Sequence, residues 1–147
     1  MEIGNRIDSA IDAVIAELGE LDLGGTAVFK AIRRRLLDPV TEPTVPVAAV
    51  WPSSCRAVSG RGAGREHSLT AVVEFLVRSK PASSAAKVTE LMGEIEDKFD
   101  ELDAKDAPGF EITVPDWSIW YSAAVALAPA GAIGTFTIKF EGKLKTE

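Results

Sequence analysis

Apolar side chains recur at helical spacing in two stretches of the chain. In the first, intervals of one, three or four residues separate Ile7, Ile11, Val14, Ile15 and Leu18. In the second, the same intervals separate Val88, Leu91, Met92, Ile95, Phe99 and Leu102. Side chains spaced in this way share one face of a helix. We therefore predict amphipathic helices over about residues 5–18 and 84–103.

Two apolar runs between these helices predict strands. Residues 45–51 are nearly continuously apolar and rich in β-branched side chains, as in a strand that is covered on both faces. Residues 69–77 alternate, with Val73 and Phe75 among the side chains of one face and Glu74 on the other. The alternating run is the most secure of the predicted strands.

The C-terminal third of the chain predicts further strands. Residues 110–114, with the sequence FEITV, could form a short strand between Pro108 and Pro115. Residues 119–127 and 136–144 each carry strand-like alternating side chains, and in the second run polar residues occupy the other face. The sequence APAGAIG at 128–134 predicts the turn of a hairpin between these two runs.

Two segments have no clear apolar period of their own. Residues 26–37 fit both a helical face and strand alternation, so the pattern leaves their structure open. Residues 52–67 contain Gly60, Gly62 and Gly64 without an apolar period, which predicts a long loop. Loops of that length in small domains usually bind something or become ordered with a partner.

The order of these elements predicts an α+β fold. We expect a mainly antiparallel sheet of about four to five strands, with two amphipathic helices packed on one face. A length of 147 residues corresponds to one domain over residues 1–147. No apolar stretch reaches the roughly 18 to 20 residues of a membrane span, and the first residues do not resemble a secretion signal, so we expect a soluble, unsecreted chain.

Charge is unevenly distributed along the chain. The 22 acidic and 16 basic residues give a net charge of −6, which argues against nonspecific nucleic-acid binding. Residues 88–106 are strongly acidic, whereas residues 30–67 are mainly basic. The sequence therefore predicts an acidic surface on the second helix and a separate basic surface.

Few side chains are suited to catalysis or metal binding. One cysteine, Cys55, and one histidine, His67, cannot form a disulfide within the chain or a Cys/His zinc site. His67 is expected to be an ordinary surface histidine, and a thiol pair of Cys55 with His67 would lie on the predicted loop, where it is poorly positioned. The glycines at 60–64 lack the GK[ST] ending of a phosphate loop, and the acids of the second helix lack a calcium-loop pattern. We predict no catalytic residue, no metal and no cofactor.

Two clusters of side chains have two interpretations each. Arg33, Arg34 and Arg35 would alternate faces on a strand, so at least one should meet solvent, nucleic acid or an acidic partner. They could equally protect an edge strand from stray pairing. Trp117 and Trp120, with Tyr121, could complete the core or anchor an interface.

The ordered layout resembles the tail terminator (tail completion) proteins of tailed bacteriophages. The resemblance rests on an N-terminal helix, the proline-preceded strand at 46–50, the strand at 69–77, a helix, and the closing strand at 134–141. It covers nearly the whole chain and is one of pattern and order. It implies that residues 26–37 form a strand and that residues 52–67 and 128–134 contact neighbouring rings.

The resemblance also implies a role. It implies a structural virion protein of the tail or neck, assembled in the host cytoplasm, that forms a ring, commonly a hexamer, and has no enzyme activity. The ring would cap the tail tube and meet the head connector, with DNA only passing through its channel. The candidate subunit or ring contacts are Arg33, Arg34, Arg35, Arg56, Arg61, Arg65, Glu94, Asp97, Glu101, Trp117 and Trp120.

Three other functions stay open at the level of sequence. Another neck or head-completion protein of the same assembly has a similar size. A small α+β hydrolase or thioesterase-like enzyme, using a carboxylate or Cys55, belongs to a different class. The third is a separate ligand-binding or protein-binding module. An ordered apolar pocket with a carboxylate of raised pKa would favour the enzyme, whereas a flat patch with mobile loops would favour the ring subunit.

Overall fold

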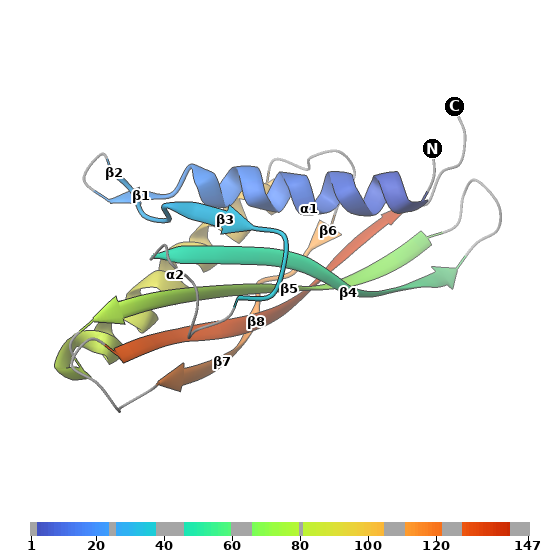
Figure 1. Ribbon diagram of the computed structural model, residues 1–147. Helices are drawn as coiled ribbons and strands as arrows, with labels where there is room; N and C mark the ends of the chain where they lie inside the picture. The colour runs from blue at the N-terminus through green and yellow to red at the C-terminus, as the bar shows by residue number, and fades with distance from the viewer. Residues whose placement is uncertain are drawn as a thin grey trace.

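A computed structural model describes residues 3–23, 26–37, 46–59, 66–79, 81–104, 111–121 and 128–141 of the chain. The order of elements is helix, short strands, two long strands, helix and three further strands (Figure 1). The α+β fold expected from the sequence is confirmed, with two helices and a mostly antiparallel sheet. None of the helices within these ranges is both long and apolar enough to span a membrane.

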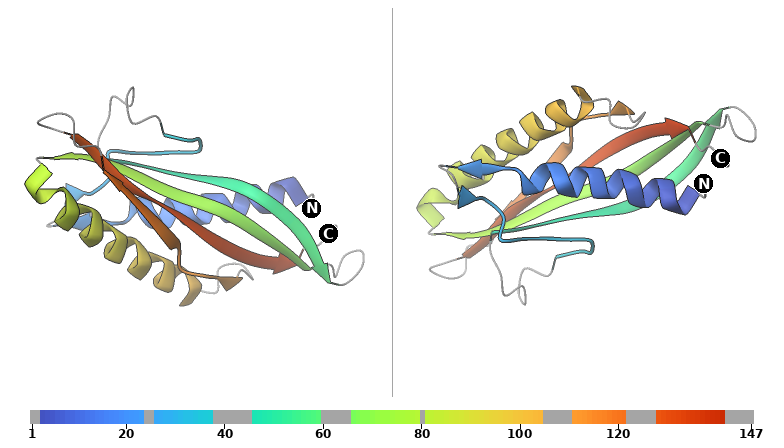
Figure 2. Two further views of the ribbon diagram at one scale, coloured as in Figure 1. Left: turned by 90° about the horizontal axis from the view of Figure 1, so that it is seen from below. Right: turned by 90° about the horizontal axis from the view of Figure 1, so that it is seen from above.

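Both predicted helices are present and slightly longer than expected. Helix α1 spans Ile3–Gly19 and helix α2 spans Pro81–Ala104. Pro81 starts α2, where its fixed φ angle suits the first helical position and no hydrogen bond is lost. In the view from above, α1 crosses the long strands, whereas α2 runs in roughly the same direction as they do (Figure 2).

The main sheet has six strands. Its order is β3 (Ala31–Arg33), β4 (Val47–Ser59), β5 (Glu66–Ser79), β8 (Ala128–Glu141) and β6 (Glu111–Ile112), and β7 (Asp116–Tyr121) also pairs with β8. The β3–β4 pair is parallel and the other pairs are antiparallel. Two further short strands, β1 (Asp22–Leu23) and β2 (Thr26–Ala27), form a separate antiparallel pair.

The core lies between the sheet and the two helices. Phe75 on β5 and Phe136 on β8 are almost fully buried, and Phe136 meets Phe99 of α2 edge to face with ring centroids 4.8 Å apart. Ile11 and Val14 of α1 belong to the same core. Both helices therefore cover one face of the sheet, called here the helix face. Glu74 lies between the core residues Val73 and Phe75 on β5 and so projects from the opposite side, which is turned away from α2 and is called the front face.

Residues 26–37 contain short strands and no helix. The segment contributes β2 and β3, separated by Val28, Phe29 and Lys30. The amide of Lys30 donates to the carbonyl of Pro46 across 2.9 Å, which brings β3 alongside the start of β4. The strand alternative is thus confirmed for two short pieces of the segment.

The prediction of a loop at 52–67 is wrong for residues 52–59 and 66–67, which belong to strands. Strand β4 continues to Ser59 and β5 starts at Glu66, with ladder pairs such as Arg56 with Ser68. The side chains from Pro52 to Val58 are exposed, so no face of this stretch is buried and no apolar period arises. Residues 60–65 lie outside the described part of the chain.

The predicted turn at 128–134 is also wrong. These residues belong to β8, which pairs with β5 on one side and with β7 on the other. Gly131 and Gly134 serve close packing within the sheet: a Cβ at Gly131 would lie 2.0 Å from the carbonyl oxygen of Phe75. The strands of the predicted hairpin do pair, but their connection falls at 122–127, outside the described residues.

Candidate functional site

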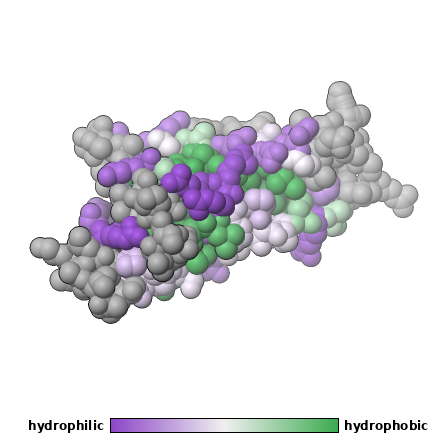
Figure 3. Space-filling view, in the orientation of Figure 1, coloured by the Kyte–Doolittle hydropathy of each residue, from purple (hydrophilic) through white to green (hydrophobic). Residues whose placement is uncertain are grey.

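An apolar groove of about 430 Å³ lies on the front face of the sheet. Four strands and the segment after β3 contribute its lining: Leu36, Leu37, Trp51, Glu74, Phe75, Leu76, Trp120 and Ile133. In the space-filling view, apolar surface shows between hydrophilic side chains on this side of the molecule (Figure 3). Leu36 is 65% exposed and Ile133 is 40% exposed, so the rim of the groove offers apolar surface to a partner.

The register of the sheet brings the groove side chains together. Residues directly opposite each other on paired strands project from the same face. Glu74 lies opposite Ala49, and Trp120 lies opposite Gly131. Because Gly131 has no side chain, the Trp120 ring can lie over the strand; a Cβ there would be 3.1 Å from Trp120 Cζ2.

Glu74 is the polar centre of the groove. Its side chain is only 8% exposed, and Trp51 Nε1 donates to Glu74 Oε2 across 2.8 Å. Within the described part of the chain no lysine or arginine forms a salt bridge with this carboxylate. An ionised carboxylate in such surroundings is stabilised by a positive group, so the groove is suited to a cationic, partly apolar ligand.

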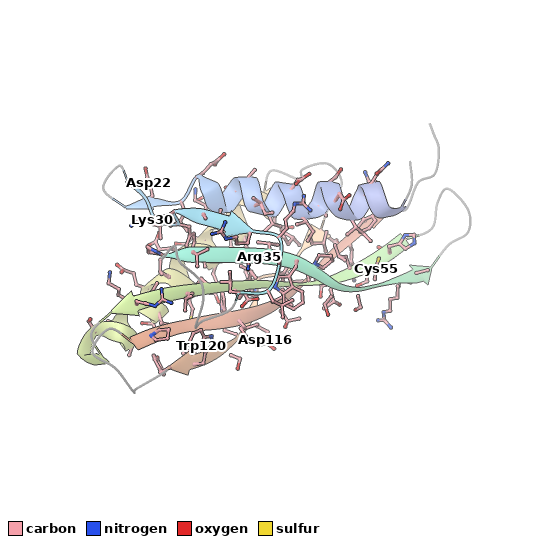
Figure 4. All side chains as sticks on the ribbon, in the orientation of Figure 1. Asp22, Lys30, Arg35, Cys55, Asp116 and Trp120 are labelled. Atoms are coloured by element: carbon pink, nitrogen blue, oxygen red, sulfur yellow. The ribbon has the colours of Figure 1, made fainter. Side chains whose placement is uncertain are left out.

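The arginines at 33–35 lie in three different settings. Arg33 is half-buried on β3, and Arg35 is exposed and donates to the carbonyl of Leu36 across 3.1 Å. Arg34 forms salt bridges with Asp8 and Asp12 of α1. Contacts within the chain therefore neutralise part of the predicted basic surface. Lys30 precedes β3 and Arg35 follows it, so the two lie toward opposite ends of this strand (Figure 4).

The other predicted arginines lie far along the chain from this cluster. Arg56 is exposed on β4, and Arg61 and Arg65 lie outside the described residues. Figure 4 shows the neighbouring Cys55 toward the other end of the sheet from Trp120. We call this end, formed by residues 54–59, 66–70 and 137–141, the distal end.

The acidic residues predicted on the second helix lie on α2. Asp97 and Glu101 are exposed, and Glu94 is half-buried. Lys98 Nζ lies 3.3 Å from Glu101 Oε1 and 3.9 Å from Oε2 of Glu17, a residue of α1 that is 4% exposed. The acids of α2 are thus on the side of the sheet opposite the groove.

The two tryptophans lie on different faces. Trp117 packs against the core, meets Phe75 edge to face and donates to Glu96 Oε2 across 3.0 Å. Trp120 lines the groove. The core interpretation therefore holds for Trp117, whereas an interface role for Trp120 stays a prediction.

Cys55 and His67 lie near each other on paired strands of the distal end. Cys55 pairs with Leu69, and His67 pairs with Ala57. The His67 ring stacks on the Phe140 ring with centroids 5.7 Å apart. The guanidinium of Arg6 lies over the Phe140 ring, 5.5 Å from its centroid. Neighbouring atoms partly desolvate the Cys55 thiol and raise its pKa, which disfavours the thiolate that nucleophilic catalysis needs.

Other chemistry is sparse in the described ranges. There, no three side chains among His, Cys, Asp and Glu come together as a metal site. A second, smaller hollow of about 160 Å³ lies beside β6 and is lined by Asp103, Glu111, Ile112, Thr113, Thr137 and Lys139. Asp103 Oδ1 accepts a hydrogen bond from the amide of Ile112 across 3.1 Å, and this bond connects α2 to the edge strand β6.

Among the residues that line the groove, sequence reasoning assigned a binding role only to Trp120. The carboxylate of the groove comes from an alternating strand in which Glu74 stands between Val72 and Leu76, both buried. A charged side chain between two large apolar ones on the same strand face was the available signal. Comparison with known proteins adds no assignment: no protein-family model matches the chain, and no curated protein matches it.

Proposed function

We propose that the chain is the ring-forming subunit of a tail terminator in a tailed phage or prophage. The observation that carries the proposal is the apolar groove of the front face. Leu36 and Ile133 expose apolar surface beside a nearly buried carboxylate on a side of the sheet that neither helix covers. Such a surface is typical of a contact with another protein chain.

The distribution of charge supports a head-to-tail contact. The acids of α2 lie behind the sheet, whereas Lys30 and Arg33 lie along its β3 edge and Arg35 lies in the segment that follows β3. A surface of one sign can then meet a surface of the other sign on the next copy. Repeated head-to-tail contacts close into a ring when the rotation between copies permits.

In this proposal the partners are further copies of the chain, the tail tube protein and the head connector. The assembled ring belongs to the tail or neck of the virion, and DNA passes through its channel. The protein acts by binding and needs no cofactor. The general layout of an N-terminal helix, long paired strands and a closing strand supports the resemblance on which this assignment rests.

Light scattering over a series of protein and salt concentrations, with negative-stain images, tests the proposal. We expect a ring of about six subunits that loosens as salt screens the charged contacts. The same measurement is made with assembled tail tubes present, because the ring can require a template. Failure to form rings in both settings would contradict the proposal.

Two exposed apolar residues provide a matched pair of variants. Ile133→Asp places a charge in the groove, whereas Val114→Asp places one between β6 and β7, at a side chain of similar exposure. We expect Ile133→Asp to prevent ring formation, because it adds a carboxylate beside Glu74. Val114→Asp should assemble like the unmodified chain. Equal behaviour of the two variants would show that the groove is not the contact.

A further inference from the structure

The unpaired charge of Glu74 indicates what the groove binds. This carboxylate is nearly buried among apolar side chains, and Trp51 provides the one hydrogen bond that it receives from the described residues. One neutral donor only partly replaces the water that the carboxylate loses. A guanidinium would supply two donors and the opposite charge in a planar arrangement that matches a carboxylate.

Arg56 is the complementary group on the same chain. It is exposed, and no carboxylate within the described ranges forms a salt bridge with it. Its ladder partner is Ser68, which lies an even number of positions from Glu74 on β5, so both charges project from the front face. Val58, two residues along β4, is 47% exposed and adds apolar surface at the distal end.

Arg56 and Glu74 are too far apart to pair within one molecule. Ser68 and Glu74 are six positions apart on β5, which corresponds to about 20 Å along an extended strand. The side chain of arginine does not span that distance. Each copy therefore presents a cation at the distal end and a carboxylate in the groove, and a salt bridge between these two groups requires a second molecule.

We propose that the distal end of one copy docks on the front face of a second copy, with Arg56 entering the groove and pairing with Glu74. The volume of the groove, about 430 Å³, has the size of ligand pockets and accommodates a long side chain. Val58 then packs near the exposed rim formed by Leu36 and Ile133. This assignment rests on the proposed function, because it names the contact through which copies would assemble.

A zero-length cross-link tests the pair directly. Arg56→Lys keeps the positive charge and introduces an amine that a carbodiimide joins to a carboxylate in contact with it. We expect an amide between this amine and Glu74 of another copy, identified by mass spectrometry of the digested bands. The conservative change at an exposed site leaves the fold intact.

Two control variants locate the reaction. Adding Glu74→Gln to Arg56→Lys removes the carboxylate while keeping the shape of the side chain, and this specific cross-link should be lost. Ala57→Lys, with Arg56 retained, places an amine one residue further along β4, where the ladder partner is His67 on the other face. This variant should give no cross-link to Glu74. A cross-link from position 57 would show that the reaction does not depend on a specific contact at position 56.

The outcomes separate this inference from the proposed ring. A series of cross-linked oligomers up to the size of the ring supports the ring and the Arg56–Glu74 contact, because each copy then uses its distal end and its groove with different neighbours. Linked dimers with no larger species support the Arg56–Glu74 contact but show that it is two-fold, which contradicts the ring. Rings that form without this link overturn the inference and leave the proposed function standing. Absence of both rings and the link overturns both.

Discussion

The indole N–H of Trp117 donates to Glu96 Oε2 across 3.0 Å, which connects strand β7 to helix α2. The same indole ring meets Phe75 at an interplanar angle of 72°, with centroids 5.9 Å apart. In the described part of the chain the ladder hydrogen bonds of β7 go to β8. Trp117 therefore contacts the helix, the central strand β5 and the core from one position at the edge of the sheet.

Trp117→Phe should separate the hydrogen bond from the packing. A phenyl ring keeps most of the contact with Phe75 but cannot donate to Glu96, so we expect the free energy of unfolding to fall by about 1–2 kcal/mol. Urea unfolding measures the change. Ser118→Ala, at the exposed neighbouring residue, should stay within about 0.5 kcal/mol of the unmodified chain. A Trp117→Phe variant as stable as Ser118→Ala would show that the bond to α2 adds nothing.

Gly131→Ala should be strongly destabilising. The added methyl group would meet the carbonyl oxygen of Phe75 at 2.0 Å, so β5 and β8 would have to separate. We expect a loss of about 3 kcal/mol or more, measured by thermal or urea unfolding.

A second glycine supplies the control for this substitution. Gly93 lies on α2, and a Cβ there meets nothing within 4 Å. Gly93→Ala should therefore raise the free energy of unfolding by about 0.5–1 kcal/mol, because alanine favours the helix. Similar effects at the two positions would contradict the close approach of β8 to β5.

Lys98→Met should destabilise the contact between the two helices. Lys98 Nζ lies 3.9 Å from the nearly buried Glu17 of α1, and its loss leaves a carboxylate without that cation. We expect the free energy of unfolding to fall by about 1–3 kcal/mol in urea titrations. Lys87→Met, at an exposed site of the same helix, should change it by less than about 0.5 kcal/mol. Adding Glu17→Gln to Lys98→Met should recover part of the loss; no recovery would show that charge is not the cause.

The Cys55 thiol should react slowly at neutral pH. Partial desolvation raises its pKa, so the reactive thiolate forms at higher pH than in an unfolded chain. We expect the alkylation rate, followed with iodoacetamide from about pH 7 to 10, to have its midpoint above that of the urea-unfolded protein. A midpoint at or below the unfolded value would contradict the desolvated thiol.

The sequence predicted the helices because burial on a single side leaves a regular pattern, and it predicted the central strand β5 although both faces are buried from Ala71 to Val77. The core positions of α1, such as Ile11 and Val14, repeat at helical spacing, and Phe75 alternates with polar or smaller neighbours on β5. Residues 47–50 are all fully buried, as the continuous apolar run predicted. Both patterns report burial, which is why they succeed where one side or both sides of an element are covered.

The two wrong predictions concern segments whose pattern of apolar residues does not reflect how they are packed. Residues 52–58 form part of β4, but their side chains are exposed. Ladder hydrogen bonds keep this segment in the sheet, and its sequence therefore has no apolar pattern that would predict a strand. Gly131 and Gly134 suggested a turn, yet they allow close contact with Phe75 and Trp117. The glycines act there through the absence of a side chain, and a single sequence does not distinguish that use from a turn.

The groove could not be predicted because it depends on register between distant strands. Trp51 and Glu74 are 23 residues apart and meet across neighbouring strands, and Trp120 joins them from the far side of β8. Side-chain alternation identifies the face of each residue but not the cross-strand neighbour. The charged residue between Val72 and Leu76 was visible in the sequence, whereas its isolation from other charges required the structure.

The outer edge of β4 has a consequence for how copies of this chain aggregate. Strand β3 pairs with β4 at Val47–Ala49, and within the described ranges no strand covers the edge beyond that point. Pro52 lacks an amide hydrogen, and register shifts interrupt the ladder between Pro52 and Ser54 and between Ala57 and Ser59. A second strand adding to this edge would find its hydrogen bonds broken at irregular intervals. The long sheet is thereby protected from growing into an amyloid-like fibril while the side chains of its broad face stay available for contact.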